Sequence, residues 1–99
     1  MTMEVRIQAI HFEVSEKLVN FINKKVDRLV RHFASVTTAE VTLKVVKPET
    51  AMNKQVIIKI TAPQHEDLVA DKTADSFEEA VDLALEALSR QLEKRKEKN

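Results

Sequence analysis

Residues 16–33 repeat apolar side chains with the period of an α-helix, and this pattern constrains the fold more than any other feature. At 100° per residue, with Leu18 at the origin, the apolar residues fall within an arc roughly 120° wide. They are Leu18, Val19, Ile22, Val26, Leu29, Val30 and Phe33. Ser15 precedes the segment as a candidate N-cap. A face this broad has to be buried, so the helix must pack on a partner surface.

A second helix is predicted from Ser76 onward. Ser76-Phe77-Glu78-Glu79 matches a capping box, in which Ser76 and Glu79 satisfy free amides at the helix start. The apolar face that follows consists of Phe77, Val81, Ala84, Leu85, Leu88 and Leu92. No apolar residue follows Leu92, although the sequence remains favourable for helix. The core-facing part of this helix therefore ends about two turns before the chain does.

Three segments place apolar residues at every second position, which is typical of strands with one buried face. They begin at Val5, Ala39 and Val56, and residues 68–73 are predicted as a fourth strand. With the helices, they give the order β-α-β-β-β-α and a fold of the α+β class. We expect one domain over residues 1–99, with a four-stranded mixed sheet, a right-handed first crossover and both helices on one face. The polar residues predicted for the open face are Arg6, Gln8, Thr42, Lys44, Lys59 and Thr61.

Composition excludes several kinds of chemistry. The chain has no cysteine, so disulfides, thiol catalysis and thiolate metal sites are absent. It also has no glycine, which excludes the phosphate-binding loops of Walker and Rossmann type. Its N-terminus does not resemble a signal peptide, and no apolar stretch reaches the roughly 20 residues of a membrane helix. We expect a cytoplasmic protein with no membrane partner.

No catalytic or metal site is predicted. His11, His32 and His65 are widely separated and share no ligand spacing. Asp67, Asp71 and Asp75 recur every fourth residue, but a strand and a turn do not bring such a series together on a cation. We therefore expect a binding protein rather than an enzyme, with no cofactor and no small-molecule substrate.

The distribution of charge is more informative than its sum, because 16 Lys and Arg residues balance 16 Asp and Glu residues. On the first helix, five cations lie on the side away from the apolar arc: Lys17, Lys24, Lys25, Arg28 and Arg31. Glu16 and Asp27 lie off this stripe. The second helix is acidic in its first half and basic in its second half, where Arg90, Lys94 and Lys98 form another stripe.

Two interpretations of these stripes stay open. A solvated outer face explains the first, and complementation of the helix dipole explains the second. Side by side, however, the two stripes would border one positive groove with the acids elsewhere, as suits a polyanion. RNA is favoured over DNA because no DNA-binding motif is present. With neither Trp nor Tyr, contact with phosphates is favoured over base stacking. The alternative is a protein-interaction module that uses the open sheet face.

Three stretches resemble the family of ribosome hibernation promoting factors, which includes ribosome-associated inhibitor A and is also called the sigma 54 modulation family. They are LVNFINKKVDRLVRHF at 18–33, HEDLVAD at 65–71 leading to DSFEEAVD at 75–82, and LSRQLEKRK at 88–96. The last is similar to the family ending L-x-R-Q-L-x-K-x-K. The resemblance covers essentially the whole chain and implies the same β-α-β-β-β-α fold.

The resemblance also implies a function. Such a protein would bind the small ribosomal subunit, and its 16S rRNA, in the channel for mRNA and tRNA during stress or stationary phase. It would inhibit translation and protect idle ribosomes. The positions that match rRNA contacts are Lys24, Lys25, Arg28, Arg31, Arg90, Gln91, Lys94 and Lys96. The chain ends at Asn99 and resembles the short form, without the second domain of long relatives. We expect a monomer away from the ribosome.

Overall fold

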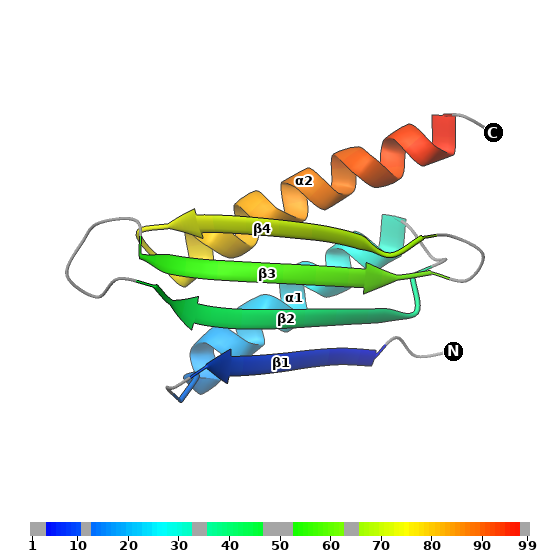
Figure 1. The fold of residues 1–99 in the computed structure, drawn as a ribbon. Helices are drawn as coiled ribbons and strands as arrows, with labels where there is room; N and C mark the ends of the chain where they lie inside the picture. The colour runs from blue at the N-terminus through cyan, green and yellow to red at the C-terminus, as the bar shows by residue number, and fades with distance from the viewer. Residues whose placement is uncertain (1–3, 11–12, 33–35, 47–52, 63–65, 98–99) are drawn as a thin grey trace.

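A computed structural model describes residues 4–10, 13–32, 36–46, 53–62 and 66–97, with the backbone alone at residue 32 and at residues 95–97. The elements follow the predicted order (Figure 1). Their bounds are β1 Glu4–Ile10, α1 Glu16–His32, β2 Thr38–Val45, β3 Lys54–Thr61, β4 Leu68–Ala74 and α2 Phe77–Glu97. Each element includes the segment predicted for it, apart from Phe33, which lies outside the described residues.

The four strands form one mixed sheet in the order β1-β2-β3-β4. β1 pairs with β2 in parallel, whereas β2 with β3 and β3 with β4 pair antiparallel. Ile7 lies opposite Val41, which lies opposite Ile58, so the apolar positions of three strands share one face. The predicted α+β class and the four-stranded mixed sheet are confirmed.

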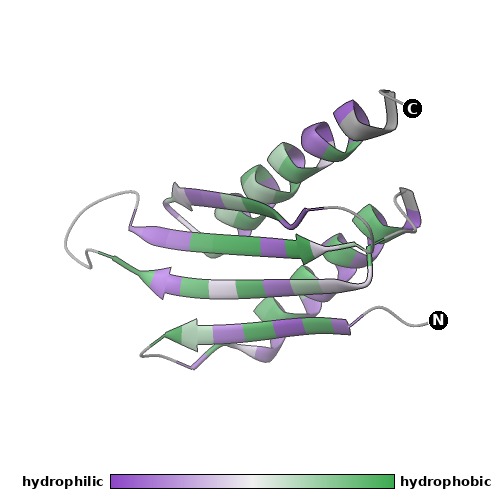
Figure 2. Cartoon of the chain, turned by 45° about the vertical axis from the view of Figure 1, so that its right-hand side comes forward, coloured by the Kyte–Doolittle hydropathy of each residue, from purple (hydrophilic) through white to green (hydrophobic). Residues whose placement is uncertain are grey.

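Both helices cover that apolar face and leave the other face open, as predicted (Figures 1 and 2). α2 packs on β3 and β4, and α1 packs beside α2. The side chains between these layers are removed from solvent, which is the main favourable contribution to folding. The largest fully buried ones are Ile22, Val26, Val41, Leu43, Val56, Ile58, Val81 and Leu88.

Both helices begin at the predicted serine caps. The Ser15 hydroxyl accepts a hydrogen bond from the Leu18 amide at 3.1 Å, and the Ser76 hydroxyl accepts one from the Glu79 amide at 3.2 Å. Each cap satisfies an amide that has no partner inside its helix. The caps fix where the apolar face of each helix starts, and with it the direction in which the basic residues point.

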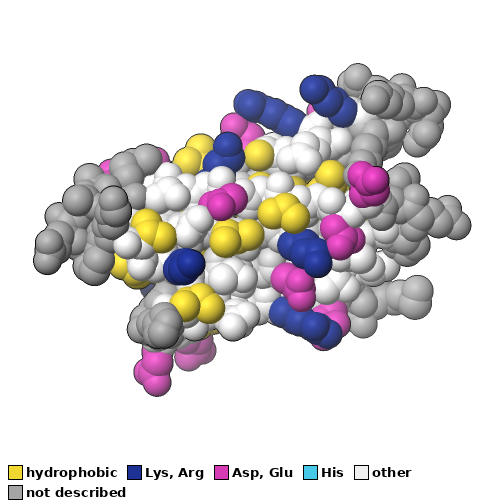
Figure 3. All heavy atoms as spheres, viewed as in Figure 1, with side chains coloured by type: hydrophobic (Ala, Val, Ile, Leu, Met, Phe, Trp, Pro, Cys, Tyr) yellow, Lys and Arg dark blue, Asp and Glu magenta, His cyan; other side chains and the backbone are white. Residues whose placement is uncertain are grey.

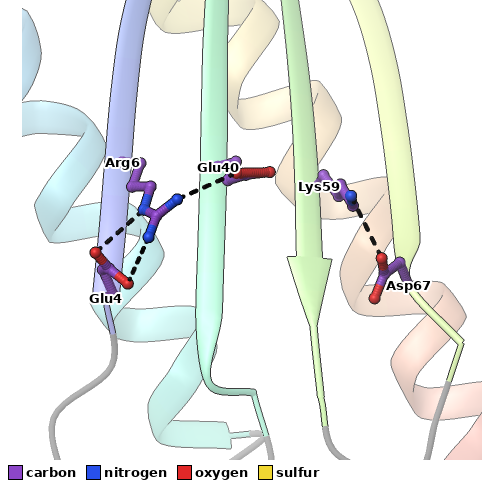
Figure 4. A network of polar contacts seen from close by, with 5 residues as sticks. All are labelled: Glu4, Arg6, Glu40, Lys59 and Asp67. Atoms are coloured by element: carbon purple, nitrogen blue, oxygen red, sulfur yellow. Dashed lines mark hydrogen bonds and ion pairs between the residues drawn. The ribbon is translucent and has the colours of Figure 1, made fainter.

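The crossover from β1 through α1 to β2 is left-handed, so the predicted right-handed crossover is wrong. Seen from the open face with β1 running upward, β2 lies to its right and α1 lies behind the sheet (Figures 1 and 4). About 98% of such crossovers have the opposite hand. Here the polar open face cannot bury the apolar arc of α1, which must share a face with α2. One edge of β2 pairs with β3, so β1 can pair only with the other edge. With the face of α1 and the edge of β1 both determined, the crossover has to be left-handed.

α2 extends past the end of the sheet (Figure 1). Its 21 residues correspond to about 31 Å of helix, and Leu92 is its last buried apolar residue. The basic end of α2 therefore projects from the domain. Neither helix in the described part of the chain combines the length and apolar character needed to cross a bilayer.

Candidate nucleic-acid interface

The predicted basic stripe of α1 lies on the solvent side of the helix. Lys24, Arg28 and Arg31 are exposed, and Lys25 is half-buried. The opposite side is buried in the core through Leu18, Ile22, Val26 and Leu29. The predicted orientation of this helix, with the apolar arc in the core and the basic stripe toward solvent, is therefore confirmed.

Three of these cations are paired with carboxylates, which corrects the expectation that the acids lie away from the stripes. Arg31 Nε lies 3.1 Å from Asp27, and Arg90 Nη2 lies 3.2 Å from Glu86. In both pairs the acid precedes the arginine by four residues, a spacing that brings side chains together on a helix. The acids lie at a different angle around the helix axis from the arginines, but an arginine side chain is long enough to reach the carboxylate four residues before it.

The third pair links the two helices. Lys25 Nζ of α1 lies 3.4 Å from Asp82 Oδ1 of α2. Both residues line a groove of about 430 Å³ between the helices, together with Arg28, Leu29, Leu85, Glu86 and Ser89. The groove is basic on the α1 side and acidic on the α2 side. The expected single positive groove is therefore wrong, because burial of the apolar face of α2 turns its acidic first half toward α1.

Three further cations predicted to contact rRNA have no carboxylate within 4.0 Å among the side chains that the structure describes. They are Lys24 and Arg28 on α1 and Lys94 on α2, and all three are exposed, as is Lys17, the other cation of the α1 stripe. Gln91 is half-buried on α2. Lys96 belongs to the helix, but its side chain lies outside the described residues.

Phe21 is a further residue beside the predicted cations, and the sequence interpretation did not single it out. It lies on the basic side of α1, where its half-buried ring forms a hollow of about 230 Å³ with Lys24, Lys25 and Arg28. Lys25 Nζ lies 5.5 Å from the ring centroid. The signal was present in the spacing, because residues 21, 24, 25 and 28 are neighbours on one helix face.

The open face of the sheet carries charges of both signs (Figure 3). Arg6 lies 3.1 Å from Glu4 and 3.9 Å from Glu40, and Lys59 lies 3.4 Å from Asp67 (Figure 4). The hydrogen bond that the Arg6 guanidinium donates to the Glu4 carboxylate is the main reason that the pKa of Arg6 is raised above its ordinary value. Three acids and two bases make this network a poor surface for a polyanion.

Apolar side chains also reach the open face, between these charges (Figure 3). Val69 is 51% exposed and belongs to the row that also holds Arg6, Glu40 and Lys59. Isolated exposed apolar residues are common on soluble proteins and do not by themselves mark an interface. The protein-interaction alternative thus has less support than the basic helix faces.

Among the described residues, no cluster of three or more His, Cys, Asp or Glu could hold a metal ion. His11 and His65 lie outside the described residues, as does the side chain of His32. The absence of a metal, a cofactor and a catalytic group therefore stays a prediction.

Comparison with known proteins identifies relatives over almost the whole chain. The family model "Sigma 54 modulation protein / S30EA ribosomal protein" matches residues 5–99. The ribosome hibernation promoting factor of Pseudomonas putida is 32% identical over 96 residues, covering 97% of this chain and 89% of that protein. The protein of the same name from Azotobacter vinelandii is 30% identical, covering 97% and 85%.

Solved structures of two further proteins share the fold. A ribosomal subunit interface protein from Coxiella burnetii superposes with a TM-score of 0.83 at 20% identity, over 95% of this chain and 98% of that one. The N-terminal domain of Protein Y from Thermus thermophilus gives a TM-score of 0.74 at 19% identity, with the same coverage.

Proposed function

Because this chain belongs to the family of Sigma 54 modulation proteins and S30EA ribosomal proteins, we propose that it binds the ribosome and acts in ribosome hibernation. Members of this family bind ribosomes without catalysing a reaction, which confirms the prediction that the protein is not an enzyme. The hibernation promoting factors that it resembles cover nearly all of the chain.

The site of binding that we propose is the mRNA and tRNA channel of the small subunit, held through phosphates of 16S rRNA. The observation that carries this proposal is that three exposed cations on the two helix faces, Lys24, Arg28 and Lys94, have no carboxylate partner among the described side chains. Positive side chains free of internal partners can neutralise phosphates and release counterions, which is the main source of affinity for a nucleic acid backbone.

The paired cations Lys25, Arg31 and Arg90 contribute to RNA binding by exchanging their carboxylate partner for a phosphate. Their pairs are exposed, with side-chain exposure from 34% to 79%. Such surface pairs stabilise a protein by only about 0–1 kcal/mol, so a phosphate can replace the carboxylate at little cost. Asp27, Asp82 and Glu86 thereby weaken the grip without abolishing it. The effect on translation is steric, because a domain in the channel excludes mRNA and tRNA.

The test is a double charge reversal on the helix faces. Arg28→Glu with Lys94→Glu should leave the fold intact, because both positions are exposed, and should release the protein from small subunits. The matched control is Lys44→Glu with Lys59→Glu, which makes the same change in net charge at two exposed positions of the open sheet face. Co-sedimentation with small subunits through sucrose gradients at moderate salt compares the variants with the parent.

Each outcome has a clear meaning. Release of the helix variant alone supports the proposal. If the helix variant still sediments with small subunits, the contact assignment is wrong. If the strand variant is released instead, the open sheet face, which carries Lys44, is the binding surface and the protein-interaction alternative is favoured.

A further inference from the structure

Phe21 lies within the basic face of α1 rather than in its apolar arc. The apolar arc faces the core through Leu18, Ile22, Val26 and Leu29, all at most 7% exposed. Phe21 only borders that core and remains half-buried. Lys24, Lys25 and Arg28 follow it by three, four and seven residues, so the ring and the three cations share one surface of the helix.

On this surface the half-buried Phe21 ring lies beneath the ammonium group of Lys25. Lys25 Nζ lies 5.5 Å from its centroid, a distance typical of a cation over the face of an aromatic ring. The same ammonium lies 3.4 Å from Asp82 of α2, which holds Lys25 at the border of the hollow. An aromatic face with a cation beside it offers both attractions that nucleic acids use, stacking for a base and charge for a phosphate.

The hollow limits what can enter it. Its volume of about 230 Å³ is below the roughly 300 Å³ at which pockets for whole small-molecule ligands begin. Lys24 and Arg28, which line it, have no described carboxylate partner and remain available to an anion. A single planar group joined to phosphates therefore fits the shape and the charge.

We propose that Phe21 is a stacking platform for one unstacked nucleotide of RNA, whose flanking phosphates contact Lys24 and Arg28. The base replaces the Lys25 ammonium over the ring, while Lys25 keeps Asp82 within reach. This inference rests on the proposed function and makes it more specific. It also revises the expectation from the sequence that phosphate contact alone holds the RNA.

A fluorescent variant tests the stacking directly. The chain contains no Trp and no Tyr, so Phe21→Trp introduces its only strongly fluorescent side chain. The probes are hexa-adenylate and an abasic sugar-phosphate hexamer of the same charge, at low salt. We expect hexa-adenylate to quench the emission and the abasic hexamer to leave it nearly unchanged. Leu83→Trp is the matched control, because Leu83 is 39% exposed on α2 and does not line the hollow.

A second variant measures the contribution to affinity. Phe21→Leu keeps an apolar side chain at the border of the core and removes the aromatic face. Base stacking on an aromatic side chain is worth about 1 kcal/mol at the low end of its range, which predicts about fivefold weaker binding of hexa-adenylate. Binding of the abasic hexamer should not change. Thermal unfolding followed by circular dichroism confirms that the variant is folded.

Equal quenching by both hexamers, or equal quenching of the Leu83→Trp variant, would overturn the inference. An equal loss of affinity for both hexamers in Phe21→Leu would do the same. These results would leave the proposed function standing as long as the helix charge reversal still releases the protein from small subunits. Retention of that charge-reversed variant would overturn the proposed function instead, so the two failures are distinguishable.

Discussion

Arg28 and Arg31 offer a stringent test of how ion pairs within the protein affect its grip on RNA. Both are exposed arginines on α1, about one turn apart. They differ in their ion pairing, since Arg31 is bound to Asp27 at 3.1 Å whereas Arg28 has no carboxylate partner among the described side chains. The substitutions Arg28→Gln and Arg31→Gln therefore each remove one positive charge, in the first case from an unpaired side chain and in the second from an ion pair.

The expected effect follows from counterion release. Each phosphate neutralised by a cation makes the logarithm of the binding constant fall by about 0.7–0.9 per logarithmic unit of salt. Arg28→Gln should lower the slope by this amount, which corresponds to about threefold less loss of affinity between about 50 and 200 mM salt. Arg31 must leave Asp27 to reach a phosphate, and the freed carboxylate then takes up a cation. Arg31→Gln should therefore change the slope little.

The assay is the dissociation constant for purified small subunits across a salt series at constant magnesium concentration. Asp27→Asn completes the set, because it frees Arg31 and should raise the slope by about 0.7–0.9. Equal slopes for the two arginine variants, or no response to Asp27→Asn, would refute the reasoning that internal pairs decide which cations contribute.

Three further predictions concern stability and affinity. Leu88→Ala should lower the free energy of unfolding by about 2–5 kcal/mol, because Leu88 is fully buried. Leu83→Ala on the same helix should lower it by less than about 1 kcal/mol, because Leu83 is exposed, and urea unfolding compares the two variants. Ser76→Ala removes the cap of α2 and should cost about 1 kcal/mol, seen as a fall of about 4–8 °C in Tm by calorimetry, and an unchanged Tm would contradict the capping role. Asp82→Asn frees Lys25 and should tighten binding to small subunits by up to about fivefold at low salt, and this gain should disappear at high salt. Binding titrations at two salt concentrations measure the gain, and a gain that persists at high salt would contradict the prediction.

The fold could be predicted from the sequence because each element carries its own periodic signal. The apolar arc of α1 and the alternation along β2 each identify one buried face, and Ser15 and Ser76 mark where the helices start. The hand of the crossover could not be predicted in this way. It depends on which edge of β2 stays free after β3 has paired, and no single segment contains that information.

The candidate site was predicted only in part, for a related reason. Helical angles correctly placed Lys24 and Arg28 toward solvent. They could not show that Asp82 of α2 meets Lys25 of α1, because the rotation of one helix relative to the other is set by packing on the sheet. Phe21 was not singled out because the absence of Trp and Tyr favoured phosphate contact over base stacking.

The charges on the open face also affect the register in which β1 pairs with β2. β1 joins the sheet through β2 alone, and sliding it by two residues would keep Val5 and Ile7 on the buried side. Such a slide would set Arg6 opposite Thr38 or Thr42 in place of Glu40. Hydrophobic alternation alone tolerates that error, whereas the alternating signs along Arg6, Glu40 and Lys59 penalise it. The solvent-facing charges thus favour the observed register of β1 on β2, which the alternation of apolar residues alone does not determine.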